Sequence, residues 1–315
     1  MRFSTIGTVL SLSIFGILCW GCATNSTQQN ISKMIEYRKM MDRQKAEIAQ
    51  REEASRKIPD MTAEGYEKLG DNYLSQGSLD MAFLQYGKAL QLDPGQARIH
   101  YKMGRLFLEK GLGEEAKNEF QAVLKAKPDD ALAYEGMGRV FFSARNYSEA
   151  EKNFKQAIKL SSDLWQAHNF LGLIYDRQGQ FETAITYYKA AIVLKPDEPI
   201  LLNNLGMSLF LKNDYEKAVR AFVEALKIKG SDKRIYNNLA LALCKLERYQ
   251  EAFDAFKRGG DEASAYYNLG CIYQMAGKNK EAIQYFEKAI EVKPDFYVNA
   301  NEKLKKAEAA INIRQ

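Results

Sequence analysis

Residues Leu202–Leu209 read LNNLGMSL, and two later stretches carry the same motif. They are YNNLALAL at Tyr236–Leu243 and YYNLGCIY at Tyr266–Tyr273. Each stretch has one or two asparagines, then a leucine, then a small residue. Such a motif either contacts a partner or belongs to a packing rule that recurs along the chain. The spacing of the small residues shows that at least part of it is packing.

A small residue recurs every 34 positions through most of the chain. The series is Gly70, Gly104, Gly138, Gly172, Gly206 and Ala240, followed after 30 positions by Gly270. The residue before each is apolar: Leu69, Met103, Met137, Leu171, Leu205, Leu239 and Leu269. Twelve positions after each small residue stands an alanine: Ala82, Ala116, Ala150, Ala184, Ala218, Ala252 and Ala282. Four further on stands an aromatic residue: Tyr86, Phe120, Phe154, Tyr188, Phe222, Phe256 and Phe286.

This pattern resembles the tetratricopeptide repeat family, whose unit is a helix–turn–helix of about 34 residues. The resemblance covers residues 63–296 in seven units: 63–96, 97–130, 131–164, 165–198, 199–232, 233–262 and 263–296. It implies an all-α fold, a right-handed α-solenoid of about seven repeats, because no unit can bury its apolar faces alone. Residues 297–315 place Leu304, Ala307 and Ile311 on one helical face, so we expect them to form a C-terminal capping helix.

The recurring residues suggest how the two helices of a unit pack. The small residue and the alanine let the two backbones approach, and the aromatic ring fills the space beside them. The sixth unit lacks four residues around KRGGDEA, where Gly259 and Gly260 replace the usual ending. We expect a tighter turn or a local kink there.

Composition excludes several classes of function. Lys and Arg number 45 against 40 Asp and Glu, a bias too diffuse for a nucleic-acid surface. His100 and His168 both stand at the fourth place of a unit, so we expect packing rather than catalysis or metal binding. GCIYQMAGKN does not have the spacing of a phosphate loop. We expect no cofactor and no metal site, and we leave open whether Cys244 and Cys271 form a disulfide.

The first 21 residues differ from the rest of the chain. Arg2 precedes an apolar run from Ile6 to Trp20, which is short for a membrane span of about 20 residues. With Gly21 and Cys22 it resembles a bacterial lipoprotein signal peptide, 1–21, in which Cys22 is lipidated. Cys19 stands where such signals carry leucine, so a plainly cleaved signal and a retained inner-membrane anchor remain alternatives.

The resemblance implies a place in the bacterial envelope. Ala23 and Thr24 after the cysteine are typical of an outer-membrane lipoprotein that faces the periplasm; an inner-membrane anchored and a soluble periplasmic protein are the alternatives. Residues 22–62 are polar and charged, and we predict a tether followed by a helical spacer. Met34, Met41 and Ile48 stand seven residues apart in it, which also allows a short coiled-coil seam.

In the tetratricopeptide family, the face of the first helix opposite the packing residues binds partner segments. We expect it to hold the second, fifth, ninth, twelfth and thirteenth places of a unit, with the sixth at its edge. The candidate partner-binding residues are Tyr101, Arg105, Arg139, Phe142, Asn169, Asn203, Asn204, Met207, Phe210, Asn237, Asn238, Tyr267 and Asn268.

Three groups on this face carry distinct hypotheses. Arg105 and Arg139 either clamp a carboxylate or pair within a solvated face. Phe210, with Met207 and Leu211, either lines a peptide pocket or contacts the neighbouring unit. Among the asparagines, the sixth-place residues Asn204, Asn238 and Asn268 are common in the family. The fifth-place residues Asn169, Asn203 and Asn237 are less usual, and their amides are suited to a peptide backbone.

We therefore predict a non-enzymatic, protein-binding scaffold, attached to the membrane through an N-terminal lipid and not a nucleic-acid binder. The chain resembles the TadD-like lipoproteins of tight-adherence machines and the PilF/PilW lipoproteins of type IV pili. That resemblance implies help in assembling a pilus or its secretin. An adaptor for cell-wall hydrolases or polysaccharide export is the alternative. An enzyme would need a catalytic domain beyond the repeats, the tether and the cap.

Overall fold

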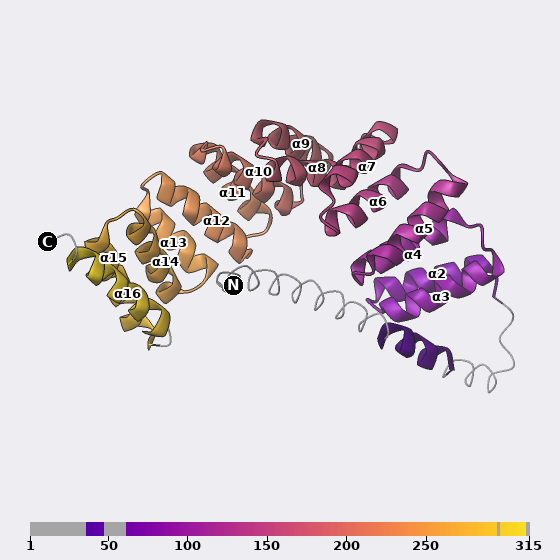
Figure 1. The fold of residues 1–315 in the computed structure, drawn as a ribbon, viewed down its shortest axis with the longest axis horizontal. Coiled ribbons are helices and arrows are strands. Elements are labelled where there is room, and N and C mark those ends of the chain that lie inside the picture. The colour runs from indigo at the N-terminus through magenta and orange to yellow at the C-terminus, as the bar shows by residue number, and fades with distance from the viewer. Residues whose placement is uncertain (1–35, 47–60, 295–296, 313–315) are drawn as a thin grey trace, which may run out of the picture. The chain divides into compact units, whose positions relative to one another are not determined.

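The structure is a computed structural model that describes residues 36–46, 61–294 and 297–312 (Figure 1). Within these ranges every regular element is a helix and none is a strand. None of the helices there combines the length and the apolar character needed to cross a bilayer. The signal peptide with Cys22, as well as Met34 and Ile48, lies outside the described residues.

The helices fall into two compact units that divide after Pro128, and each is considered separately. The first contains helix 36–46, α2 (Ala63–Ser75), α3 (Leu79–Leu92), α4 (Ala97–Glu109) and α5 (Gly113–Ala126). The second contains α6 (Ala131–Ser143), α7 (Tyr147–Leu160), α8 (Trp165–Arg177), α9 (Phe181–Leu194), α10 (Pro199–Leu211), α11 (Tyr215–Ile228), α12 (Lys233–Lys245), α13 (Tyr249–Gly259), α14 (Glu262–Met275), α15 (Asn279–Val292) and α16 (Tyr297–Asn312).

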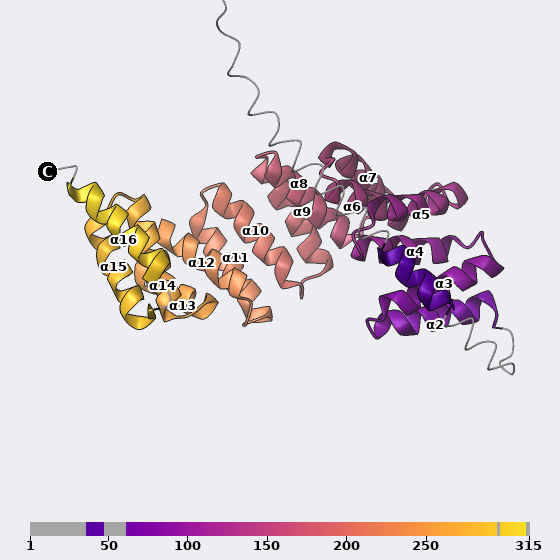
Figure 2. The same ribbon diagram turned by 60° about the horizontal axis from the view of Figure 1, so that its bottom comes forward.

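Successive helices pair as the repeat predicts, α2 with α3, α4 with α5, and so on to α14 with α15. In the second unit these pairs follow one another in order, with α16 against α15 at the end (Figure 2). This confirms the predicted all-α repeat architecture and its C-terminal cap. Ala300 and Ala307 of α16 are fully buried, and Gln274 donates a hydrogen bond of 3.2 Å to the Lys303 carbonyl.

The turn inside every repeat uses one residue in the left-handed region. Glycine takes this place in four repeats, at residues 77, 111, 179 and 277. Arg145, Asn213 and Glu247 take it in the others, with φ between 58° and 68°. Asparagine tolerates this conformation, whereas an arginine or glutamate costs about 1–2 kcal/mol there. The tertiary packing of the helices therefore outweighs local preference in two of the seven turns.

Six of the seven helix pairs are held by an aromatic ring that lies on a glycine. An added Cβ at Gly206 would come within 2.6 Å of the Phe222 ring, and at Gly172 within 2.5 Å of the Tyr188 ring. Both rings are fully buried. The same contact joins Gly70 to Tyr86, Gly104 to Phe120, Gly138 to Phe154 and Gly270 to Phe286. The predicted packing of small residue against ring is confirmed in each of these six repeats.

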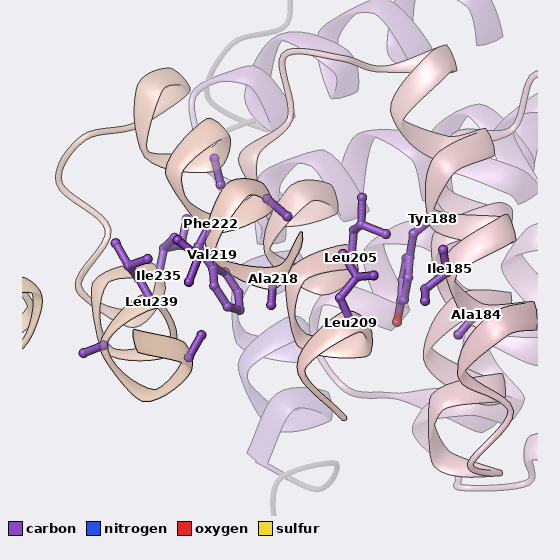
Figure 3. Close-up of a cluster of buried hydrophobic side chains, with 14 of the residues drawn as sticks. Ala184, Ile185, Tyr188, Leu205, Leu209, Ala218, Val219, Phe222, Ile235 and Leu239 are labelled. Carbon is purple, nitrogen blue, oxygen red and sulfur yellow. The ribbon is translucent and has the colours of Figure 1, made fainter. Parts of the chain in front are cut away.

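Apolar side chains continue the core from one repeat to the next. Figure 3 shows this continuity across α9 to α12, where Tyr188, Leu205, Phe222 and Leu239 are among the labelled side chains. Within the second unit the core therefore runs along the stack of repeats, and an inner repeat relies on both of its neighbours for the burial of its apolar surface.

Of the tighter turn and the local kink expected in the sixth repeat, the structure has the tighter turn. Its second helix, α13, has 11 residues where the second helix of every other repeat has 14. It ends at Gly259, and Asp261 caps α14 by accepting a hydrogen bond of 2.8 Å from the Ser264 amide. An added Cβ at Gly259 would lie 2.5 Å from Asn237 Oδ1, so the end of α13 presses on α12.

Residues 36–46 are helical, as predicted, but they are not a solvated spacer. The Tyr37 ring meets the Phe83 ring edge-on with centroids 5.9 Å apart, and Lys110 Nζ lies 4.2 Å from the Tyr37 centroid. Met41 is buried. The side chains of Tyr37 and Met41 stand four residues apart, so one face of this helix packs on the first two repeats.

We predict that Gly206→Ala lowers the free energy of unfolding by about 1–3 kcal/mol, because its methyl group overlaps the Phe222 ring. Gly87→Ala is the matched control, since nothing lies within 4 Å of its added Cβ. It should raise stability by about 0.5–1 kcal/mol. Urea denaturation of both variants checks this, and equal changes would contradict the packing role of the glycine.

Candidate functional site

The candidate site is the first-helix face, which we define as the side of α6, α8, α10, α12 and α14 that carries the fifth, sixth, ninth, twelfth and thirteenth places. From α6 to α12 each of these helices contacts the next one in the series. Side chains on neighbouring first helices can therefore reach one another, and this proximity decides which of the predicted residues remain available.

The asparagines of this face bond to each other. Asn204 Nδ2 donates to Asn169 Oδ1 at 2.9 Å, and Asn238 Nδ2 donates to Asn203 Oδ1 at 2.8 Å. Asn203 Nδ2 lies 3.5 Å from Asn204 Oδ1, which links the two pairs. Asn203 is only 8% exposed. We call these four residues the asparagine ladder. It joins three successive first helices.

The ladder pairs the fifth place of one repeat with the sixth place of the next. These two places lie on different parts of the face of one helix, so their pairing was not predicted, although the 34-residue period brings them together. The amides of Asn169 and Asn203 are thus engaged inside the protein. Their binding to a partner remains a prediction.

The ladder does not extend into the seventh repeat. Asn237, which would accept from Asn268 by the same rule, lies against the end of α13 at Gly259. Among the described residues Asn268 makes no side-chain hydrogen bond. The short sixth repeat thus interrupts the amide pairing, and both side chains are half-buried.

Two of the three predicted groove aromatics of the second unit, Phe142 and Phe210, have internal contacts as follows. The Phe142 ring lies 5.0 Å from Phe170 of the next repeat and 5.5 Å from Tyr147. Phe210 lies 5.4 Å from Tyr215 of its own repeat. Both rings, with Met207, are half-buried against the core. They help to pack helices, and a peptide pocket at Phe210 and Met207 stays a prediction.

Large apolar side chains with high exposure do remain on this face. Leu211, at the end of α10, is 45% exposed, and Met275, at the end of α14, is 85% exposed. Neither is required by the repeat. Tyr267 is half-buried beside Phe286, with ring centroids 5.9 Å apart.

In the first unit, charges on the corresponding side of α2 and α4 pair internally. The buried Glu67 carboxylate accepts from Arg98 and Lys102, and Lys102 Nζ also lies 2.7 Å from Asp71. Burial raises the pKa of Asp71, but hydrogen bonds from Lys102 and from Tyr86 outweigh it and leave that pKa below its usual value. The charges of Glu67, Asp71, Arg98 and Lys102 are therefore paired with one another.

The two predicted clamp arginines belong to different units. Arg105 is exposed on α4 in the first unit, and Arg139 is half-buried on α6 in the second. Tyr101, one turn before Arg105, packs its ring 6.0 Å from Phe120. A joint action of the two arginines on a carboxylate stays a prediction.

The groups that most resemble catalytic residues have structural partners. His100 Nδ1 lies 2.6 Å from Glu119 Oε2, and its Nε2 lies 3.0 Å from the Pro94 carbonyl. His168 Nε2 lies 3.0 Å from the Ser162 carbonyl. Each histidine thus lies within hydrogen-bonding distance of a backbone carbonyl six residues earlier in the chain. Across the part of the chain that the structure describes, no group of three His, Cys, Asp or Glu side chains could hold a metal ion.

The two cysteines of the repeats are free thiols. Cys244 is buried, and burial raises the pKa of its thiol to about 12, so it stays protonated and unreactive at neutral pH. Burial also raises the pKa of Cys271, although a hydrogen bond with Tyr267 opposes this shift. A disulfide between the two is absent from the structure.

The stacked helix pairs, the ring-on-glycine contacts and the first-helix face define a tetratricopeptide-repeat array, a class that serves protein–protein interaction and is generally without enzymatic activity. The family described as the cilia and flagella-associated protein 70 C-terminal domain matches residues 32–265, and the tetratricopeptide repeat itself matches residues 263–296. The first match spans more than half of the chain, so the chain belongs to that family. The matched region begins before the first repeat and includes helix 36–46.

No curated protein matches the chain. Among solved structures, part of a tetratricopeptide protein of Cytophaga hutchinsonii is similar, with a TM-score of 0.57 and 16% identity over 75% of this chain and 98% of that one. PilF of Pseudomonas aeruginosa is similar with a TM-score of 0.52 and 20% identity, over 68% and 96%. YrrB, described as having an unusual peptide-binding site, has a TM-score of 0.50 and 19% identity, over 58% and 97%. At these identities the likeness shows the fold alone.

We predict that Asn203→Ala lowers the free energy of unfolding by about 1–3 kcal/mol, because Asn238 then loses its acceptor in a half-buried place. Asn268→Ala should change stability by less than about 0.5 kcal/mol, since Asn268 makes no such bond. Denaturation of Asn203→Ala, Asn238→Ala and the double variant gives the coupling energy. A double variant whose loss equals the sum of the single losses would refute the ladder.

Proposed function

We propose that this chain is a non-enzymatic scaffold, anchored by a lipid on Cys22 and facing the periplasm, which holds a segment of a protein partner on its first-helix face. Its role is to assist the assembly of an envelope machine such as a type IV or tight-adherence pilus or its secretin. The repeat domain supports the binding role, and residues 1–22 support the anchor.

The observation that carries the binding role is the exposure of Leu211 and Met275 on a face where Phe142, Met207 and Phe210 are half-buried. An exposed leucine or methionine in water is common, but these two stand on the face that the family uses for partners. A peptide that crosses the ends of α10 and α14 would bury both side chains.

The assembly role is supported by a likeness of fold. The fold likeness to PilF agrees with a pilus-related lipoprotein. The family's own description names a cilium- and flagellum-associated protein, and we take from it the repeat domain and not a location. The anchor and the partner therefore need separate tests.

We predict that Cys22→Ser moves the protein from the membrane fraction to the soluble periplasmic fraction, because the lipid acceptor is lost. Fractionation with metabolic labelling by a fatty acid checks this, with Cys271→Ser as the control that keeps both label and location. A Cys22→Ser protein that stays in the membrane would instead favour a retained apolar anchor.

We predict that Leu211→Asp combined with Met275→Asp reduces crosslinked capture of a partner at least tenfold while the melting temperature stays within a few degrees, since both side chains are exposed. Val193→Asp is the control, because Val193 is 81% exposed and lies on a second helix. Mass spectrometry of the captured protein shows whether it is a secretin. Undiminished capture by the double variant would remove the first-helix face from the proposal.

A further inference from the structure

A pocket of about 260 Å³ opens in the second unit where α11, α12 and α13 meet. Its lining residues come from repeats five and six and include Val219, Val223, Tyr236, Leu239, Leu243 and Ala255, with charged side chains of α13 at the rim. The residues from α12 stand at the fourth, seventh and eleventh places of the repeat, on the packing side of that helix. The pocket is therefore separate from the first-helix face.

Small side chains leave this junction open. At the next junction along the chain, the Phe253 ring lies 4.7 Å from Tyr266, and Tyr273 stacks on a further tyrosine ring at 5.1 Å. Val219 and Leu243 stand at the repeat positions that Phe253 and Tyr273 occupy there. Replacing two aromatic rings by two aliphatic side chains leaves an unfilled volume between the helices.

The first unit shows what such a junction accepts. Phe83 and Phe107, with ring centroids 5.3 Å apart, are at the same repeat positions as Val219 and Leu243. Helix 36–46 lies there, with the Tyr37 ring against Phe83. A helix that places an aromatic residue over this junction is thus already present within the chain.

The rim of the pocket carries an exposed apolar side chain, Val223. Val223 is 38% exposed and is the only apolar side chain at its repeat position. The other repeats have Gly87, Gln121, Lys155, Lys189, Lys257 and Glu287 there. Five of these six are polar or charged, so solvent would favour a polar side chain at position 223 as well.

Two charges on the rim form no salt bridge within the described residues, although the negative charge of Asp254 acts on the neighbouring Lys257. Arg248 and Glu251 pair with each other at 2.6 Å. In the region that the structure describes, Asp254 accepts no hydrogen bond, and Arg258 meets no carboxylate, although its guanidinium lies 5.9 Å from the Tyr236 ring centroid. Asp254 and Arg258 are one helical turn apart, so they present a negative and a positive charge side by side.

We propose that this pocket is a second interaction surface, which binds an amphipathic helix of a partner protein. An aromatic side chain of that helix enters between Val219, Leu243 and Ala255. A carboxylate and a basic side chain one turn apart on it pair with Arg258 and Asp254. An apolar residue four positions from the aromatic covers Val223, as Met41 accompanies Tyr37 in helix 36–46.

The sequence of helix 36–46 serves as the probe, because it has the required chemistry. EYRKMMDRQKA offers Tyr37 and Met41 on one face, and carboxylates and bases beside them. A peptide of 11 residues is too short to stay helical alone, so a hydrocarbon staple joins positions 39 and 43, both exposed in the structure. The matched control peptide carries Tyr37→Ala.

The peptide is titrated into the full chain with ¹³C-labelled valine and leucine methyl groups. We expect saturable shifts at Val219, Val223 and Leu243, at least tenfold weaker binding by the control peptide, and at least tenfold weaker binding to the protein variant Val223→Arg. The variant Val193→Arg, exposed on α9, should bind as the unaltered protein does. Circular dichroism confirms that both variants stay folded.

Three results would overturn the proposal: no shift at these methyl groups at millimolar peptide, equal affinity for folded Val223→Arg, or equal affinity of the two peptides. Light scattering shows whether the unaltered protein is an oligomer and Val223→Arg a monomer. That result would overturn the proposal that another protein binds here, because the pocket would then bind a second copy of this chain. Leu211 and Met275 take no part in this test, so its outcome is independent of the first-helix face.

Discussion

The structure depends on one contact, the aromatic ring that lies on a glycine inside a repeat. In six repeats an added methyl group at the glycine would come within 3 Å of ring carbons, so the two helices are as close as their backbones allow. This contact sets the separation of the first and second helix of each pair. Once that separation is set, the side chains on the outer sides of the pair meet the next repeat in a repeated geometry.

That repeated geometry explains why so many residues expected to bind a partner are occupied internally. Neighbouring first helices lie close enough for Asn238 to reach Asn203, and for Phe142 to reach Phe170. Polar and aromatic groups on such a face stabilise the array before any ligand arrives. Exposed apolar side chains such as Leu211 and Met275 therefore indicate a candidate binding surface more clearly than the asparagines and aromatic residues do.

The sixth repeat shows how one local change alters both sides of the array. Its shortened second helix ends against Asn237, and the asparagine ladder stops there. On the other side of α12, the same repeat forms one wall of the open pocket beside Val223. The aromatic residues that fill the next junction show that this opening is a matter of side-chain size, since the helices continue to pack in the same order.

The sequence by itself determined the all-α repeat, its seven units, and the pairing of Gly206 with Phe222 and its equivalents. All of these follow from helical periodicity within one repeat. Only the tertiary structure decided the hydrogen-bond partners of Asn169 and Asn203, the internal packing of Phe210 and the place where helix 36–46 packs. These contacts depend on the rotation between adjacent repeats. The helical period predicts which face of a helix a residue lies on, but it does not predict which residue of another repeat contacts it.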